Sequence, residues 1–283
     1  MTRSPEILYH YTDTVAMLNI LQRGELWATD ANYLNDSNEL QHGRNELYSA
    51  LTAKQVELGE HVTRGGHWRG TDLGILRAEL EYHAKGESLQ LATGGPFVSC
   101  FCEDGDLLSQ WRGYAGGSGW AIGFAREWLE SVCYRRGRPQ ALRQVVYGVA
   151  GIGPMVERVL AEQTIDPLAR KGPSWGQARE ICDTGLAGIK DDAFVEEREW
   201  RLILQGAPGG EQFRPGRVGL TPYLKVPFPK EAIKEVVIGP SVYSTLQWRA
   251  AARLLEGIFG LTRSEDGDVG RAVKLRSSAA PYR

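Results

Sequence analysis

Two acidic residues separated by a single position open a strand-like segment near residue 200. In Glu197-Arg198-Glu199-Trp200-Arg201, alternate side chains of a strand would share a face, so Glu197, Glu199 and Arg201 should lie together. Paired carboxylates can move protons or stabilise positive charge, whereas on an exposed strand they would form only weak ion pairs. The apolar run that follows indicates a strand at least half buried, in which carboxylates need partners such as Arg201.

A histidine in a short N-terminal strand is the second candidate. Residues 7–11 have strand character, and His10 would point away from Tyr9 and Tyr11. An imidazole at a strand end can act as acid or base near neutral pH, or donate to a ribose hydroxyl or phosphate. It can equally be a core histidine bonded to a backbone carbonyl, and both interpretations stay open.

A third group of polar residues follows the second expected strand. Asp36 and Glu39 have the spacing of a capping box, which predicts the start of a helix. That interpretation leaves Tyr33 and Asn35 without a structural reason. An aromatic ring at Tyr33 would suit one wall of a pocket.

A fourth group surrounds Trp111. Helical spacing places Trp111 and Tyr114 on neighbouring positions of one face, where a core role is expected, and a glycine-rich run follows at 116–119. Arg112 is the member suited to bind a phosphate or carboxylate.

Composition limits the class of protein. The chain has 283 residues, 42% of them hydrophobic, and a formal net charge of -2, so bulk charge gives no support for nucleic-acid binding. It has no apolar run long enough for a membrane span and no signal-peptide pattern at its start, so we expect a cytoplasmic protein.

Cys100 and Cys102 would share a face of a strand, but further zinc ligands at short spacing are missing from the sequence.

The pattern along the chain favours one elaborated α+β domain over residues 1–283, with helical insertions near 38–90 and 152–193. The expected strands cover residues 7–11, 26–29, 97–101, 119–124, 142–149, 199–204, 218–226, 235–238 and 271–275. The expected helices cover residues 14–23, 38–60, 72–85, 107–114, 154–169, 177–192 and 243–259. We read the sum as a mixed, largely antiparallel sheet with helices inserted between its strands.

Several short motifs, in this order, resemble one family. They are Tyr9-His10-Tyr11, Leu34-Asn35-Asp36 with Glu39, Cys100-Phe101-Cys102, Trp111 with Tyr114, residues 119–124 and residues 197–201. Together they resemble an uncharacterised, mostly bacterial group called domain of unknown function 2971. The resemblance spans nearly the whole chain, and the family name implies no reaction.

A second similarity, over fewer residues, is to the ADP-ribosyltransferase superfamily, which binds NAD in the cleft of a split β-sheet. There the first strand ends in a histidine or arginine, an aromatic or serine follows, and a glutamate begins a late strand. His10, Tyr33 and Glu199 occur here in that order. The glutamate pair also looks like the Glu-x-Glu of arginine-modifying members, and residues 9–12 are similar to the first strand of DNA-modifying ones.

This second resemblance implies a split-sheet fold like that of the ADP-ribosyltransferases, with NAD as substrate. Glu199 would hold the ribose 2′-hydroxyl and stabilise charge, Glu197 would face the acceptor, and His10 would position a ribose hydroxyl. The further NAD-binding candidates are Tyr11, Thr12, Tyr33, Asn35, Arg112, Tyr114 and Arg201. Which of Tyr33, Tyr114 and Trp111 would stack on nicotinamide stays open, and the chain lacks the Ser-Thr-Ser strand of the superfamily.

The sequence therefore predicts an NAD-dependent ADP-ribosyltransferase or NAD glycohydrolase, with a role as a bacterial toxin or phage-defence effector. Two alternatives remain: a metal-dependent nuclease or phosphoesterase using Asp36, Glu39, Glu197 and Glu199, and a non-catalytic binding module. The acceptor, whether protein, nucleic acid or water, and the oligomeric state are left open, and no membrane partner is expected.

Overall fold

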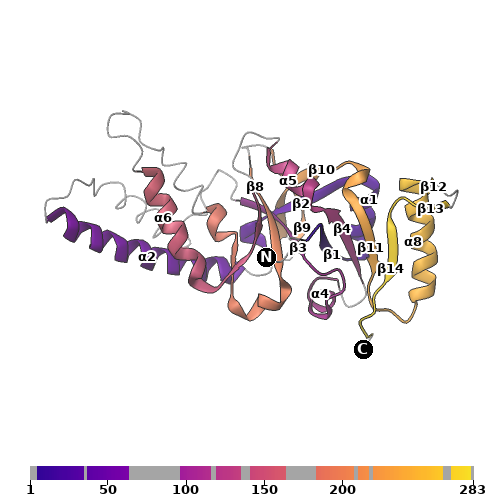
Figure 1. Cartoon of the computed structure of the whole chain (residues 1–283), viewed down its shortest axis with the longest axis horizontal. Coiled ribbons are helices and arrows are strands. Elements are labelled where there is room, and N and C mark those ends of the chain that lie inside the picture. The colour runs from indigo at the N-terminus through magenta and orange to yellow at the C-terminus, as the bar shows by residue number, and fades with distance from the viewer. Residues whose placement is uncertain are drawn as a thin grey trace.

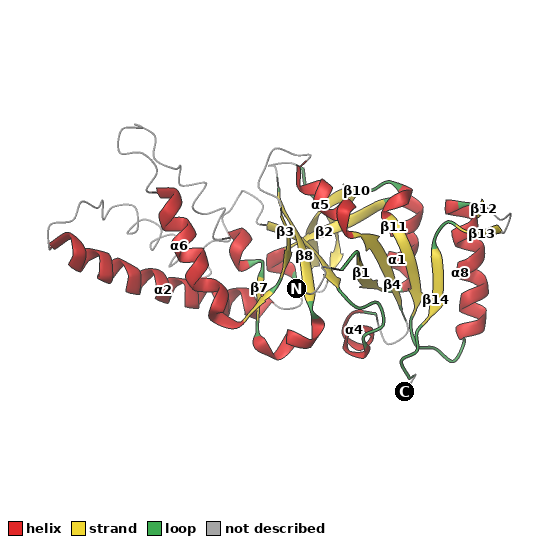
Figure 2. Cartoon of the chain, viewed as in Figure 1, coloured by secondary structure: helices red, strands yellow, loops and turns green. Residues whose placement is uncertain are grey.

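The fold was obtained as a computed structural model (Figure 1). It describes residues 5–34, 37–63, 96–115, 119–134, 141–163, 183–206, 210–216, 219–263 and 269–281. The helix expected over 72–85 lies outside these residues. Strands gather in the middle of the molecule, and helices lie on both sides of them (Figure 2).

The chain begins with a strand, a helix and a second strand, as predicted. These are β1 (Ile7–Thr12), α1 (Thr14–Arg23) and β2 (Glu25–Asp30). Asp13 caps α1, since its Oδ1 accepts the backbone N–H of Ala16 at 2.8 Å. Gly24 ends the helix in the left-handed conformation, with φ 64°. Local sequence signals therefore place β1 and β2 within one short segment.

The main sheet is mixed and largely antiparallel, which confirms the predicted fold class. Its remaining strands are β3 (Pro96–Cys102), β4 (Trp120–Ala125), β5 (Ala141–Gln144), β8 (Glu199–Gln205), β9 (Gln212–Gly216), β10 (Gly219–Pro227), β11 (Ile233–Ile238) and β14 (Lys274–Ser277). The β11–β14 pair is parallel, and the other pairs in this sheet are antiparallel. The sheet is open.

The sheet forks at β3. Along one edge β3 pairs with β8 over its whole length, from Pro96 to Cys102. The other edge is shared: β1 pairs there only at Cys102, and β2 only at Phe97 and Val98. One branch continues from β1 to β4, β11 and β14, and the other from β2 to β10 and β9. Between the two branches, residues 99–101 of β3 pair with no strand on that edge within the described chain.

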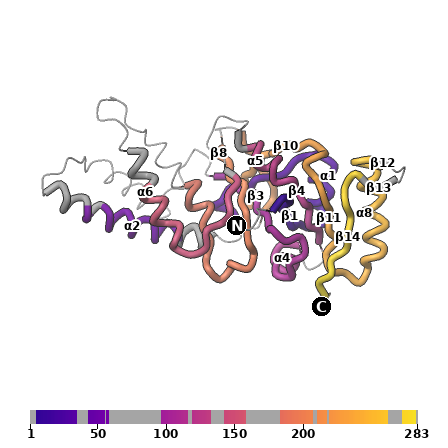
Figure 3. Tube along the Cα trace, viewed as in Figure 1, coloured from indigo at the N-terminus to yellow at the C-terminus, as the bar shows by residue number. Residues whose placement is uncertain are grey.

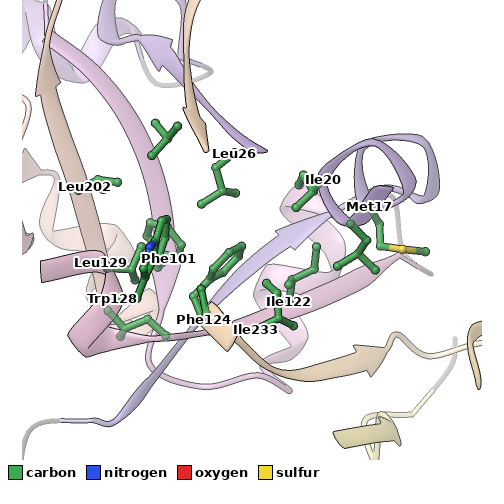
Figure 4. Close-up of a cluster of buried hydrophobic side chains, with 14 of the residues drawn as sticks. Met17, Ile20, Leu26, Phe101, Ile122, Phe124, Trp128, Leu129, Leu202 and Ile233 are labelled. Atoms are coloured by element: carbon green, nitrogen blue, oxygen red, sulfur yellow. The ribbon is translucent and has the colours of Figure 1, made fainter. Parts of the chain in front are cut away.

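Helices cover both faces of the sheet. They are α2 (Ser37–Thr63), α4 (Leu108–Tyr114), α5 (Arg126–Tyr134), α6 (Ile152–Gln163) and α8 (Ser244–Phe259). The largest core cluster joins α1, α5 and α8 to one face of the sheet, where Phe101 and Phe124 meet Trp128 (Figure 4). A smaller cluster on the other face contains Trp111 of α4.

Short elements complete the chain. They are η1 (Ala31–Tyr33), β6 (Val146–Tyr147), η3 (Gly148–Gly151), β7 (Ile189–Lys190), η4 (Asp192–Glu197), η5 (Lys230–Ala232), β12 (Leu261–Arg263) and β13 (Val269–Arg271). Helices α2 and α6 pack on each other at one end of the molecule, and α8 lies at the opposite end (Figure 3). None of the helices in the described ranges is long and apolar enough to cross a membrane.

Two predicted elements near the site were wrong in part. The strand expected over 142–149 is broken at Val145, because β5 pairs with β8 and β6 pairs with β7. It ends at Tyr147, because Gly148 adopts a left-handed conformation with φ 69° and begins the 3-10 helix η3. The helix expected over 177–192 does not reach its predicted end, because Ile189 and Lys190 pair in parallel with β6. Strand β9 and helix α5 were not predicted.

Candidate functional site

A cavity of about 230 Å³ opens at the fork of the sheet. Its walls come from both branches, from β3 and β8 at the base, and from helix α4. The lining residues are Tyr9, His10, Tyr11, Trp27, Thr29, Leu34, Val98, Ser99, Cys100, Phe101, Gln110, Tyr114, Glu197, Glu199, Arg201 and Arg214. Ligand sites commonly hold 300–1,000 Å³, so this space suits a small ligand or one end of a larger one.

Two carboxylates at the base of the cavity are joined by one lysine. Lys190 Nζ lies 2.8 Å from Glu197 Oε2 and 3.2 Å from Glu199 Oε2. Arg201 contacts Glu199 through Nε, 2.7 Å from Oε1, and through Nη2, 3.1 Å from Oε2. Arg201 Nη1 also donates to the carbonyl of Ala187 at 2.9 Å. Two cations thus balance two anions, all of them buried.

The carboxylates meet in a different way from the one predicted. Glu197 is not part of β8; it ends the 3-10 helix η4, and Arg198 follows in a left-handed conformation with φ 43°. The turn therefore brings the Glu197 side chain to Lys190, which strand geometry alone would not do. Tyr147 holds the start of β8, since its hydroxyl accepts the Glu199 backbone N–H at 2.8 Å.

The electrostatics favour the charged form of this network. Burial raises the pKa of Glu199, but Arg201 and Lys190 outweigh burial, and the net pKa lies below its ordinary value. Burial lowers the pKa of Lys190, and the two glutamates reverse this, so the net pKa is raised. Both groups stay ionised at neutral pH.

The two carboxylates differ in how fully their oxygens are used. Both oxygens of Glu199 accept from cationic nitrogens, and its side chain interacts with the Cys100 thiol as well. Glu197 Oε2 accepts from Lys190, but among the described residues its Oε1 receives only a long contact, 3.4 Å, from the hydroxyl of Tyr114. A carboxylate can accept about four hydrogen bonds, so Glu197 keeps capacity that Glu199 has largely used.

His10 lies at the point where β1 leaves β3. Its Nδ1 is 2.9 Å from the carbonyl of Cys100, one of the β3 residues left without a partner strand on that edge. Because a carbonyl only accepts, Nδ1 carries the proton and Nε2 is an acceptor in the neutral ring. Burial lowers the pKa of His10, and the carbonyl offsets this only in part. His10 is therefore neutral at pH 7. The expected bond to a backbone carbonyl is confirmed, and His10 also lines the cavity, while its role as an acid, base or ribose ligand stays a prediction.

The cysteines beside the site are suited to packing rather than nucleophilic attack. Burial raises the pKa of the Cys102 thiol to about 12 and that of Cys100 well above its usual value. Cys102 Sγ donates to the carbonyl of Glu197 at 3.0 Å, which helps to fix the turn before β8.

Helix α4 contributes an aromatic wall. Trp111 is fully buried, as predicted for a core residue, and its Nε1 donates to Asp106 at 2.8 Å. Tyr114, on the same face, packs against this cluster and places its hydroxyl beside Lys190 and Glu197. Of the three aromatics considered for stacking on a nicotinamide ring, only Tyr114 lines the cavity.

Several predicted site residues do not reach the cavity. Tyr33 is 38% exposed at the end of η1, and Arg112 is exposed on α4. Thr12 is buried opposite Trp120 of β4.

Asn35 and Asp36 lie outside the described residues, as does the side chain of Glu39, so the predicted capping box and the metal site that uses these residues stay predictions. Within the described ranges, no three His, Cys, Asp or Glu side chains group as metal ligands.

Sequence reasoning missed three residues at this site. Lys190 lay in a segment assigned to a helical insertion, and a single lysine there carries no motif. Arg214 lies on β9, an edge strand of only five residues that was not predicted. Trp27 was treated as one residue of an ordinary strand, although it lines the cavity and its ring centroid lies 4.4 Å from that of Tyr223. Lys190 reaches the site through the pairing of β7 with β6, and Arg214 and Trp27 reach it through the β2 branch of the fork.

A family model matches part of the chain. Residues 110–202 match the model of a family described as Protein of unknown function (DUF2971). That segment carries Tyr114, Lys190, Glu197, Glu199 and Arg201, so the matched region includes the base of the cavity. It supports the family resemblance seen in the sequence. No curated protein and no solved structure matches the chain.

Proposed function

We propose that the cavity at the fork binds the nicotinamide riboside end of NAD and that the protein is an ADP-ribosyltransferase or NAD glycohydrolase. One observation carries the proposal: His10 of β1 and the glutamates beside β8 line the same cavity, although they lie far apart in the chain. The size of the cavity implies that the adenosine end of the dinucleotide lies outside it.

The chemistry needs negative charge close to the ribose. When the bond between nicotinamide and ribose C1′ breaks, its electron pair leaves with nicotinamide, and positive charge develops on the ribose. A water or acceptor group then bonds to C1′ and loses a proton. A fixed carboxylate near the ribose stabilises that charge in a site shielded from water.

The contacts support different proposed roles for the two glutamates. Glu197 is the carboxylate with a free acceptor position, so it is the one proposed to hold a ribose hydroxyl and stabilise the developing charge. Glu199, held by Arg201 and Lys190, would be a positioning residue that keeps Lys190 and thereby Glu197 in place. This reverses the roles that the superfamily resemblance implied for the pair.

His10 and Tyr114 complete the proposed site. Neutral His10 presents Nε2 as an acceptor for a second ribose hydroxyl. Tyr114 lines the cavity, and its aromatic ring is the one proposed to stack on nicotinamide. A cytoplasmic role as a toxin or phage-defence effector would follow from depletion of NAD or modification of an acceptor.

The test is direct. Purified full-length protein is titrated with NAD in a calorimeter, and free nicotinamide is then quantified after incubation with and without cell extract. Binding together with nicotinamide release supports the proposal. Release that requires extract identifies a transferase with a macromolecular acceptor. The absence of both binding and release, with and without extract, contradicts the proposal, and binding without release favours a non-catalytic module.

A further inference from the structure

Arg214 reaches the cavity from the opposite branch of the sheet. It lies on β9, opposite Thr221 of β10, and its Nη2 donates to the hydroxyl of Thr29 on β2 at 3.2 Å. The side chain therefore extends across β10 toward the fork, a span of about two strand spacings of 4.8 Å each. Thr29 and Arg214 both line the cavity.

The guanidinium of Arg214 has a buried donor with nothing to bind. Its Nε is shielded from solvent and has no hydrogen-bond partner among the described residues. No carboxylate in those same ranges forms an ion pair with it, in contrast to Arg201 at the base of the cavity. An unpaired buried donor is costly, and the cost is larger when the group is charged. Such a donor is explained when a ligand supplies the acceptor.

We propose that Arg214 is the anion-binding residue of this cavity and that it binds a phosphate oxygen of the ligand. A guanidinium matches phosphate geometry through neighbouring N–H groups, and here Nε is available while Thr29 fixes Nη2. Trp27, which also lines the cavity beside Thr29, offers an apolar wall next to this position.

The two ends of the cavity then have opposite chemistry. At the base beside β8 the glutamate charges are balanced by Lys190 and Arg201, and Glu197 offers hydrogen-bond acceptors, whereas the β2 and β9 side offers the cationic donor Arg214. A ligand with hydroxyl groups at one end and a phosphate at the other is bound in only one direction. This inference deepens the proposed function and rests on it for the identity of the sugar end. NAD bound in this direction would have its riboside beside Glu197 and its pyrophosphate beside Arg214.

The experiment uses probes that carry phosphate but no bond to cleave. Inorganic pyrophosphate and ADP-ribose are titrated into the full-length wild-type protein and into Arg214→Gln, by calorimetry. Loss of charged hydrogen bonds should weaken binding of both probes by about 10- to 100-fold. Arg253→Gln, an exposed arginine on α8, is the matched control and should bind as the wild type does.

Arg214→Lys serves as the second variant, because it keeps the positive charge and lacks the planar fork. It should bind ADP-ribose more weakly than the wild type, and it tests the proposal even where Arg214→Gln fails to fold. Equal affinity in the wild type and in each Arg214 variant that folds, or no binding of either probe to the wild type, overturns the inference. Arg214-dependent binding without any cleavage of NAD leaves this inference standing and contradicts only the proposed reaction.

Discussion

The guanidinium of Arg201 contacts both carboxylate oxygens of Glu199, with distances of 2.7 Å from Nε and 3.1 Å from Nη2. Both residues are about 4% exposed, so the pair is held in a low-dielectric interior. Two parallel N–H···O contacts fix the carboxylate plane as well as its charge. Glu199 is therefore a rigid support beneath the cavity.

Replacing Arg201 should destabilise the protein strongly. Arg201→Met keeps much of the side-chain volume but leaves Glu199 with Lys190 as its one charged partner in the described part of the chain. Removing one member of a buried ion pair costs about 3–5 kcal/mol. Urea unfolding of the variant and the wild type measures the loss. Lys225→Gln breaks the partly exposed pair with Glu25 and should cost less than about 1 kcal/mol, so equal losses in the two variants would contradict a special role for Arg201.

The Glu199 network should make stability depend on pH in acid. The folded-state pKa of Glu199 lies below its ordinary value, 4.5, because Arg201 and Lys190 outweigh the effect of burial. The unfolded chain then binds the proton first as the pH falls. The stabilisation is complete above about pH 4.5 and is lost as the pH falls through the folded-state pKa.

Glu199→Gln removes this titration. The difference in free energy of unfolding between the wild type and Glu199→Gln should therefore shrink as the pH is lowered from about 7 to about 3. Urea unfolding at several pH values measures it. A difference that stays constant over this range would show that Glu199 is not held as an ion pair.

His10 should titrate below its ordinary pKa of 6.5, because burial disfavours the charged ring. The unfolded chain then takes up the proton first, so protonation of this site reduces stability as the pH falls from about 6.5 toward the folded-state pKa. NMR of the imidazole protons gives the midpoint, with His10→Gln to assign the signal. A midpoint at or above 6.5 would mean that His10 is charged near neutral pH and would refute its role as a neutral acceptor.

The N-terminal segment shows how much local sequence determines. Asp13 and Gly24 delimit a helix between two strands through short-range signals, and each acts as predicted. The buried state of Trp111 followed from its helical spacing in the same way. Such features depend on neighbours within about four residues along the chain.

The base of the cavity could be predicted only in part, because it depends on distant pairing. Glu197 and Glu199 were chosen from strand alternation, yet the left-handed Arg198 rather than alternation brings them together. Lys190 joins them because β7 pairs with β6, and Arg214 reaches the cavity because β9 is attached to β10. Neither pairing leaves a periodic signal in a single sequence, since β7 has two residues and β9 contains a proline and a glycine.

The rate of nicotinamide release from NAD tests the central claim most directly. It is compared in the wild type, Glu197→Gln and Glu196→Gln, the last being an exposed neighbour in the same 3-10 helix that does not line the cavity. Loss of the carboxylate should slow release by about 100-fold or more in Glu197→Gln, while Glu196→Gln matches the wild type. Equal rates in the two variants, or no release by the wild type with or without cell extract, would contradict the assignment of this cavity as a site of NAD cleavage.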